Sequence, residues 1–284
     1  MNDTRARTPS RLLTALIAAA LFLALIPGPL LAQSSNPDAE SQVHRLNGRY
    51  FAKMGADLGR VVVSPLHWKG QDLAALGVTA GVVAIAFSLD ETTKDWADNH
   101  TGAGFDNFSL FVTHFGEGPF LIGFSAALYA GGEAFKNDGL RKTGLMSLES
   151  FAVSGVVVTA LKLVAGRHRP LAAHGAWDFN FFSTLNHEHS FPSGHSASAF
   201  AVASTIAGST DSFWLGAVSY GLASIVAVSR VANSEHWLSD IIVGSALGYF
   251  IGKKVLDLNR ASAAGAPSLG FGLAPGGFSL SLRF

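Results

Sequence analysis

The sequence predicts an all-α protein, a six-helix bundle embedded in a membrane, with a short β-like tail at its C-terminus. Charged residues are only 14% of the 284 residues and apolar residues are 49%, whereas a typical soluble domain has about 25% charged residues. Between residues 72 and 256, apolar stretches recur at regular intervals. They are rich in Ala, Gly, Ser and Val, small residues that let helices approach closely in a bilayer.

Charge balance and cysteine content exclude several classes of protein. The chain has 20 basic and 20 acidic side chains and a net charge of zero, so it lacks the basic field that binding to nucleic acid normally requires. It has no cysteine, which excludes disulfide frameworks, zinc–thiolate sites and cysteine nucleophiles. Membrane lipids are the expected surroundings.

Residues 1–32 are expected to be a signal peptide or an N-terminal anchor. Three arginines precede the apolar run Leu12–Ile26, and Ala32 stands directly before a polar stretch. A basic start, an apolar centre and a small residue at the end are typical of a secretory signal. Whether or not this segment is cleaved, both interpretations export the polar linker expected over residues 33–71, which has room for one or two short amphipathic pieces.

The helical domain is expected over residues 72–256. Its six predicted helices cover 73–89, 118–135, 148–165, 196–210, 212–229 and 240–255. Several are shorter than the ~20 residues that a membrane-spanning helix needs, so the sequence leaves the number of spans open.

Loop charges indicate an orientation. Residues 90–117 carry six acids and one lysine, whereas 136–142 and 253–260 carry three basic residues each. Because basic loops stay in the cytoplasm, the acidic loop and the predicted site are expected on the periplasmic side of the inner membrane. An exported N-terminus followed by a simple crossing at 73–89 would place the acidic loop inside instead, so the two indications conflict. A soluble periplasmic protein is the alternative.

Residues 257–284 are expected to form a Gly/Pro-rich tail. From residue 278 to 284, apolar and polar residues alternate with the period of a β-strand. One or two strands cannot close a membrane barrel. A terminal hairpin or a loose tail is therefore expected.

Two polar clusters stand where an apolar bundle would not place them. Lys162 and Arg169 end the third predicted helix and are seven residues, or two helical turns, apart. Before the fourth, Ser193 suits a helix N-cap, Gly194 allows close backbone approach, and His195 follows. The free amides at such a helix start point toward an anion.

A third cluster adds Arg230, His236 and Asp240. His236 and Asp240 are four residues apart, so on one helix face the carboxylate can fix the imidazole tautomer. Three cations that converge on one point indicate a tetrahedral polyanion such as phosphate. A neutral, oriented imidazole can attack phosphorus, and a second histidine can protonate the departing alkoxide. A site with these cations and histidines needs no metal and no cofactor.

The three motifs resemble the type 2 phosphatidic acid phosphatase and vanadium haloperoxidase superfamily. They read Lys-x6-Arg-Pro, Pro-Ser-Gly-His and Ser-Arg-x5-His-x3-Asp, in that order. The matching positions are Lys162, Arg169, Pro170, Pro192, Ser193, Gly194, His195, Ser229, Arg230, His236 and Asp240. The motifs span about 162–240, and the flanking helices are compatible with the family's helical bundle.

The resemblance implies a role for each matching residue. His236 corresponds to the nucleophile, His195 to the general acid, and Asp240 to the residue that orients the nucleophile. The phosphate-binding residues of the family correspond to Lys162, Arg169, Ser193, Gly194 and Arg230. These implied roles agree with those argued from the residues themselves.

Other residues have two interpretations each. The sequence His187-Glu188-His189 resembles a metal-binding motif. Its spacing better suits hydrogen bonding within a loop, and no metal site is predicted. His168, between two arginines, is expected to support the site from behind. A lipid-facing lid and ordinary loop packing are equally compatible with four aromatic residues, Trp177, Phe179, Phe181 and Phe182.

The sequence therefore predicts a metal-independent phosphatase that hydrolyses a phosphomonoester or pyrophosphate, most plausibly of a lipid, through a phosphohistidine. The alternatives are a soluble periplasmic acid phosphatase of the same superfamily and, less favoured, a vanadate-dependent haloperoxidase. A membrane scaffold or transporter with a vestigial anion site would have little need for a histidine oriented by an aspartate.

Overall fold

The computed structural model describes residues 45–100, 103–172, 174–263, 268–274 and 277–283. The expected signal peptide or anchor at 1–32 lies outside these residues. The helices are α3 (Gly48–Val63), α4 (Gly70–His100), α5 (Ala103–Thr113), α6 (Gly118–Ala134), α7 (Asp138–Ala165), α8 (Gly194–Gly208), α9 (Phe213–Ala232) and α10 (Leu238–Ala263). The strands are β1 (Ser268–Ala274) and β2 (Gly277–Arg283).

The six predicted helices are confirmed as α4 and α6 to α10, and three of them, α4, α7 and α10, are much longer than expected. Helix α7 begins ten residues earlier, at Asp138, because the Asn137 side chain caps it by accepting a hydrogen bond from the Leu140 amide. Helix α4 continues through the acidic segment to His100. Hydrophobic periodicity marks only the apolar part of such helices.

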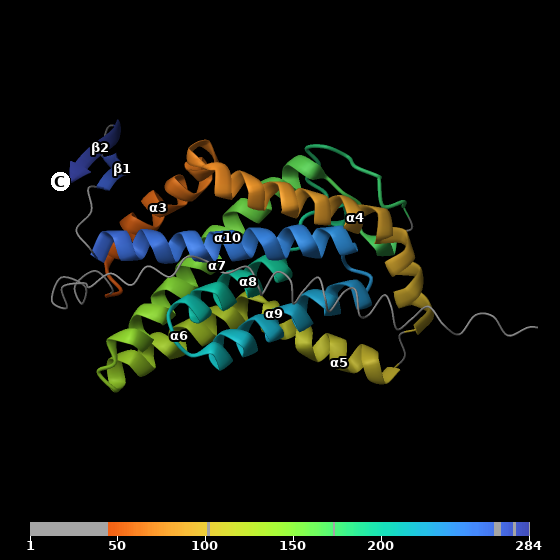
Figure 1. Cartoon of the computed structure of the whole chain (residues 1–284), viewed down its shortest axis with the longest axis horizontal. Helices are drawn as coiled ribbons and strands as arrows, with labels where there is room; N and C mark the ends of the chain where they lie inside the picture. Colours follow the sequence, from red (N-terminus) through yellow and green to blue (C-terminus); the bar gives the residue numbers. More distant parts are fainter. Residues whose placement is uncertain (1–44, 101–102, 173, 264–267, 275–276, 284) are drawn as a thin grey trace, which may run out of the picture.

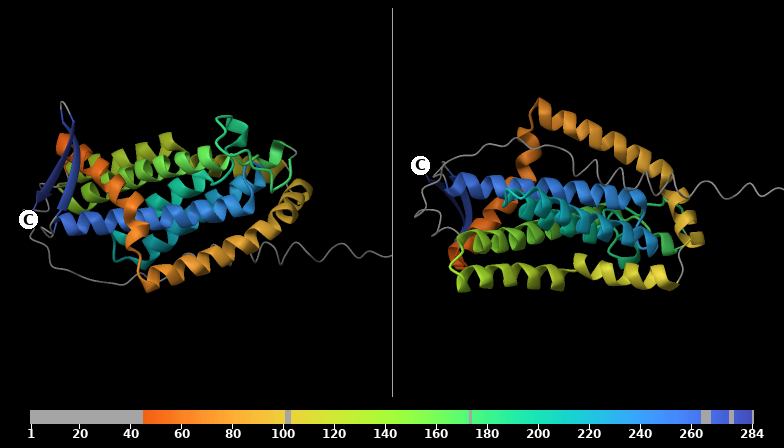
Figure 2. Two further views of the ribbon diagram at one scale, coloured as in Figure 1. Left: turned by 90° about the horizontal axis from the view of Figure 1, so that it is seen from above. Right: turned by 60° about the horizontal axis from the view of Figure 1, so that its bottom comes forward.

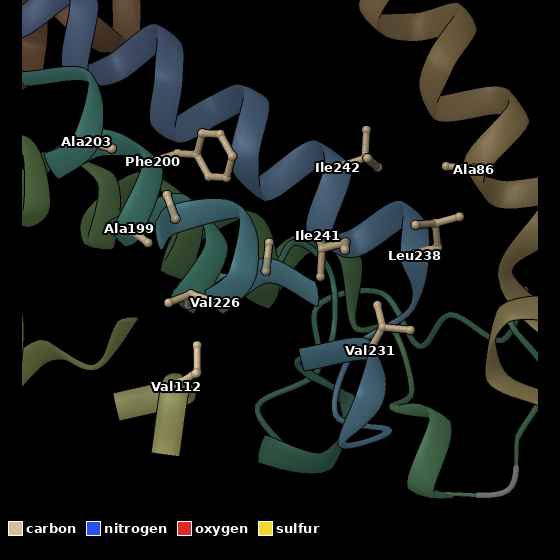
Figure 3. Close-up of a cluster of buried hydrophobic side chains, with 12 residues drawn as sticks. Ala86, Val112, Ala199, Phe200, Ala203, Val226, Val231, Leu238, Ile241 and Ile242 are labelled. Atoms are coloured by element: carbon tan, nitrogen blue, oxygen red, sulfur yellow. The ribbon is translucent and has the colours of Figure 1, made fainter. Parts of the chain in front are cut away.

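Helix α8 is the centre of the bundle. Ten consecutive residues of α8, Ser196 to Thr205, are buried, and helices α7, α9 and α10 pack around it (Figure 1). Helix α6 lies against the outer side of α7 (Figure 2). Apolar side chains from several helices meet in one core, where Phe200 of α8, Val226 of α9 and Ile241 of α10 are almost fully buried (Figure 3).

A stripe of glycines brings α8 and α10 into backbone contact. Gly244, Gly248 and Gly252 follow one another at four-residue spacing on one face of α10. A Cβ atom at Gly248 would lie 2.1 Å from the Ala197 carbonyl oxygen, and one at Gly244 would lie 2.5 Å from that of Ser193. Only glycine permits this approach, which is typical of helices that pack in membranes.

Three of the described helices, α4, α7 and α9, are long and apolar enough to cross a membrane. In α4, only 6% of the apolar window is buried inside the protein, and Leu73, Val78 and Ile85 are exposed. Such a long uncovered apolar face is unfavourable in water. The predicted membrane protein is therefore confirmed, with three candidate spans among the described residues.

Residues 48–63 differ from the predicted linker, because they form helix α3 and join the helical body. Tyr50 and Val61 are buried, and the Tyr50 hydroxyl donates to the Leu145 carbonyl oxygen at 2.8 Å. Asp57, also buried, forms ion pairs with Lys53 and Arg60. The buried positions recur at helical spacing, whereas the polar composition of the segment suggested a linker with only one or two short amphipathic pieces.

The tail contains a two-stranded antiparallel hairpin in which Ser268 pairs with Arg283 and Ala274 with Gly277. This is the hairpin form of the predicted tail. Helix α10 extends past residue 256 to Ala263 before the hairpin begins.

Candidate active site

Four helix ends meet at one end of the bundle and bring the three sequence clusters together. The helices α7 and α9 end there, and α8 and α10 begin there. The Ser193 amide donates to the Asp240 carbonyl oxygen at 3.0 Å. A Cβ atom at Gly194 would lie 3.8 Å from Cε of Lys162. Residues far apart in the sequence therefore form one site.

The predicted nucleophile, His236, is almost fully buried and faces a carboxylate. Its Nδ1 lies 3.5 Å from Oδ2 of Asp240 and 3.5 Å from Oγ of Ser190. The same Asp240 oxygen accepts hydrogen bonds from the Ser190 hydroxyl at 2.5 Å and from the Trp237 amide at 2.9 Å. These contacts hold the carboxylate in place. They involve Nδ1 of His236, so Nε2 does not contact the carboxylate.

Burial decides the charge of His236. Desolvation lowers the pKa of its imidazole to about 3, against a weaker opposing contribution from the hydrogen bond with Asp240. Burial alone would raise the pKa of Asp240, but His236 and Arg167 outweigh it, and the pKa is lowered. At pH 7 the pair is therefore a neutral imidazole beside a carboxylate, the form that a nucleophile requires.

The three predicted cations border the same site and have partners there. Lys162 donates to the His189 carbonyl oxygen. Arg169 forms an ion pair with Glu235, and Nη2 of Arg230 lies 3.7 Å from the same carboxylate oxygen. Glu235 thereby offsets the mutual repulsion of the two guanidinium groups. It was not singled out from the sequence.

Helix α5 and the short helix η2 (His114–Gly116) complete the site, although the sequence analysis placed both in an acidic loop. The Thr113 hydroxyl accepts a hydrogen bond from Nη1 of Arg230 at 3.1 Å. A Cβ atom at Gly116 would lie 3.3 Å from Cβ of His195. Burial and, next, the charge of Arg230 lower the pKa of His195 to about 4, so its imidazole is neutral at pH 7.

The chain's family follows from a comparison with known protein families. The model of the PAP2 superfamily matches residues 143–261, a segment that contains all three clusters. This segment of the chain belongs to the PAP2 superfamily. The predicted family is thus confirmed for this segment, and so is the predicted enzyme class, a phosphatase that hydrolyses phosphoric esters.

Several proteins with similar sequences are lipid A 1-phosphatases. The one from Porphyromonas gingivalis is 29% identical over 174 residues, which cover 60% of this chain and 34% of that protein. The chain thus matches about a third of that relative's length. The Rhizobium etli protein is 28% identical over 77% of this chain and 94% of its own length, and the Rhizobium johnstonii protein is 28% identical over 78% and 91%.

Two solved structures also resemble this chain. Aquifex aeolicus LpxE has a TM-score of 0.48 and 22% identity over 60% of this chain and 95% of its own. A transmembrane PAP2-type phosphatidylglycerolphosphate phosphatase from Bacillus subtilis has a TM-score of 0.49 and 21% identity over 64% and 94%.

Behind His236, the site contains an arginine that sequence reasoning missed. Arg167 is 0% exposed. Its Nη1 donates to Oδ1 of Asp240 at 2.6 Å, and its Nη2 donates to Oδ2 of Asp90 at 2.7 Å. Ser239 connects Asp90 to Arg167, because its hydroxyl donates to Asp90 at 2.7 Å and accepts from Nη1 of Arg167, also at 2.7 Å. Arg167 thus anchors the carboxylate that orients His236.

The sequence marks each of these two residues, Asp90 and Arg167, separately, although it does not show that they pair. Asp90 is the acid that directly follows the apolar stretch 73–89, and Arg167 stands between the two motif cations Lys162 and Arg169. A buried acid in α4 needs a buried cation as partner. Nothing in the sequence pairs these two positions, which are 77 residues apart.

We expect Arg167→Met to destabilise the protein strongly, because it leaves Asp90 and Asp240 buried without their cation. Breaking a buried ion pair in this way costs about 3–5 kcal/mol. The double variant Arg167→Met/Asp90→Asn should recover part of the lost melting temperature in detergent, but not the turnover, since Asp240 remains unanchored. Equal melting temperatures for Arg167→Met and wild type would contradict the anchoring role.

Proposed function

We propose that this PAP2 enzyme removes phosphate from a lipid phosphomonoester or pyrophosphate, with His236 as the nucleophile and a phosphohistidine as the intermediate. One observation carries the proposal: a neutral, carboxylate-bound histidine lies among three cations at one end of an apolar bundle. The names of the curated relatives support a lipid substrate. The apolar bundle would present the site near lipid headgroups.

In the first step, Nε2 of His236 attacks phosphorus as the bond to the lipid oxygen breaks. Lys162, Arg169 and Arg230 stabilise the charge on the phosphoryl oxygens, together with the free amides at the start of α8. His195 donates a proton to the departing alkoxide. The pKa of His195 is low in the substrate-free site, and a phosphate dianion close by raises it toward the charged form.

In the second step, the neutral His195 removes a proton from water, and the water oxygen attacks the phosphohistidine. The P–N bond breaks, which returns His236 to its neutral state and releases inorganic phosphate. Asp240 holds the imidazole by Nδ1 in both steps. The cations supply the positive charge for both transition states, so no step calls on a metal ion.

Exposed aromatic side chains beside the site support a lipid substrate. Trp177, Phe181 and Phe182 are 70%, 64% and 76% exposed. They belong to the loop between α7 and α8 that carries Arg169, and Trp177 stacks on Phe87 of α4 at 5.0 Å. Apolar side chains at this position suit contact with acyl chains, as expected for the lipid-facing lid, better than contact with water.

We expect the reconstituted enzyme to release phosphate from lipid monophosphates at least about tenfold faster, by kcat/KM, than from a water-soluble alkyl phosphate, and vanadate to block both reactions. Phe181→Ser should reduce the lipid preference. Phe213→Ser is the matched control, because this exposed phenylalanine lies at the opposite end of the bundle. A preference for the soluble ester would instead favour the acid phosphatase alternative.

We further propose that the site faces the periplasm of the inner membrane. The end of α4 with its acids, Asp90 to Asp98, and Glu117 lie at the site end, and the basic residues Lys136, Lys253 and Arg260 lie toward the other end. This agrees with the positive-inside rule. It places α3 and the start of α4 on the cytoplasmic side, unlike the exported segment expected from the sequence, and α4 then crosses outward without the conflict noted above.

Because the chain has no cysteine, single cysteine variants can test this orientation. In intact cells with a permeabilised outer membrane, we expect a membrane-impermeant maleimide to label Phe182→Cys. Lys136→Cys and Val62→Cys should be labelled only after the inner membrane is opened. The reverse pattern would place the site in the cytoplasm.

A further inference from the structure

A further group of polar side chains lies outside the candidate active site, on the loop that follows α7. We propose that His168, His174 and Asp178 bind a zinc ion that fastens this loop beside the site. The ligand atoms of these three residues all lie within 4.8 Å of one another. The proposed ion takes no part in the phosphatase mechanism, and its binding can be tested without any measurement of activity.

The central observation is an unpartnered nitrogen on His168. This side chain is nine-tenths buried, and its Nδ1 has no hydrogen-bond partner among the described residues. Its other nitrogen, Nε2, faces Oε1 of the buried Glu188 at 3.2 Å. A carboxylate at that position favours a proton on Nε2 and leaves a lone pair on Nδ1. Asn180 donates to the other oxygen of Glu188 at 3.0 Å and keeps the carboxylate in place.

The lone pair on Nδ1 faces a second carboxylate. Oδ2 of Asp178 lies 3.7 Å from Nδ1 of His168, beyond the range of a hydrogen bond. Two electron-rich atoms at this separation repel each other unless a cation lies between them. Two ligand atoms of a tetrahedral zinc ion, each at about 2.0–2.2 Å, lie roughly 3.3–3.5 Å apart. The observed separation is close to that value.

His174 supplies the third ligand. Its ring stacks on that of His168 with a centroid distance of 4.0 Å, and its Nδ1 lies 2.7 Å from the same Asp178 oxygen. The two ring planes are only 15° apart, so a single ion cannot lie in both of them while the rings are stacked. In the zinc-bound form, the half-exposed ring of His174 turns out of the stack, and the ion takes the place of the proton between His174 and Asp178. Two imidazole nitrogens and one carboxylate oxygen are a ligand set that zinc prefers, with water as the fourth ligand. Glu188 behind His168 matches the carboxylate–histidine–metal arrangement of protein zinc sites.

A neighbouring group, His168 with His187 and Glu188, also has its ligand atoms within 4.8 Å. It would use Nε2 of His168, which already faces Glu188, and would leave Nδ1 without a partner. The first group is therefore favoured. His189, which the sequence grouped with His187 and Glu188, belongs to neither group, because its ring Nε2 lies 2.9 Å from the Ser183 carbonyl oxygen.

The proposed ion would join two parts of the loop. The amide of His168 donates to the Asp178 carbonyl oxygen at 3.2 Å, and the Arg169 amide donates to the His187 carbonyl oxygen at 3.2 Å. The indole of Trp237, next to the nucleophile, donates to the His168 carbonyl oxygen at 2.8 Å. Zinc between His168, His174 and Asp178 would therefore stabilise the segment that carries Arg169.

The test uses the full-length protein in detergent, stripped of metal and then incubated with zinc chloride. We expect about one zinc ion per chain by elemental analysis after desalting, and a higher melting temperature with zinc than without. His174→Ala and Asp178→Asn should bind zinc at least about tenfold more weakly and lose the thermal shift. Glu188→Gln should weaken binding by about 10–100-fold.

Two histidine variants serve as controls. His67→Ala removes an exposed histidine outside the cluster, and His187→Ala removes the neighbouring one. Both should keep the zinc ion and the thermal shift. The proposal is overturned if the wild type retains no zinc, or if His174→Ala binds it as tightly as the wild type. Loss of zinc in His187→Ala with retention in His174→Ala would also overturn the ligand set.

Discussion

Replacing His236 by alanine should abolish turnover on every substrate, with a loss of roughly 10⁴- to 10⁶-fold in kcat. The reason is that no other described side chain offers a neutral nitrogen held by Asp240 among the three cations. No phosphoenzyme should form when the variant is mixed with a radiolabelled phosphate donor and quenched at alkaline pH, where phosphohistidine survives.

Asp240→Asn is the graded control for this experiment. In this variant the imidazole of His236 is still present, but for part of the time its proton lies on the wrong ring nitrogen. Turnover should therefore lie between that of the wild type and that of His236→Ala. Unchanged melting behaviour in detergent checks that each variant folds. A phosphoenzyme trapped in His236→Ala would refute the assignment of the nucleophile.

Replacing His195 by alanine should separate substrates by their leaving group. A lipid alkoxide needs a proton as it departs, so loss of the general acid should slow its release by roughly 10²–10⁴-fold. A p-nitrophenolate departs without that proton, so an aryl phosphate should be affected far less. The ratio of kcat/KM for the two substrates in wild type and variant measures this difference.

The comparison is informative only if binding is unchanged. The vanadate affinity of His195→Ala, measured by inhibition of the residual aryl phosphatase activity, provides that check. Equal losses on the alkyl and aryl substrates with unchanged vanadate inhibition would contradict a role as general acid. Such a result would point to Lys162 as the proton donor, because its ammonium group borders the same site.

Sequence reasoning located the parts of the molecule that follow short-range rules. The apolar periodicity of α8 and α9 is a local pattern, and the structure places both helices as expected. The expected contact between His236 and Asp240 is also present, but His236 lies in the turn before α10 and does not share a helix face with Asp240. Arg167 and Asp90 obey no local rule. Their pairing depends on how α4 packs beside the start of α10 and the loop that follows α7, which only the assembled bundle defines.

Helices α3 and α5 escaped prediction for a related reason. Both carry polar groups that are buried only because of partners elsewhere, such as the Tyr50 hydroxyl of α3 with Leu145 and Glu149, and Ser109 of α5 with Asn233. Composition alone counts such residues as solvent-exposed. The motif residues, by contrast, were recognised without any knowledge of their partners, since their identity and order are sufficient.

The glycine stripe of α10 determines how well the reacting groups keep their spacing. The start of α8 and His236, just before α10, are separated by main-chain atoms in direct contact at Gly244 and Gly248, and no flexible side chain lies between the two helices at these contacts. Heating changes side-chain rotamers more readily than it changes the separation of two backbones in contact. The distance between the proposed phosphate-binding residues of α8 and the proposed nucleophile should therefore vary little with temperature or bilayer thickness.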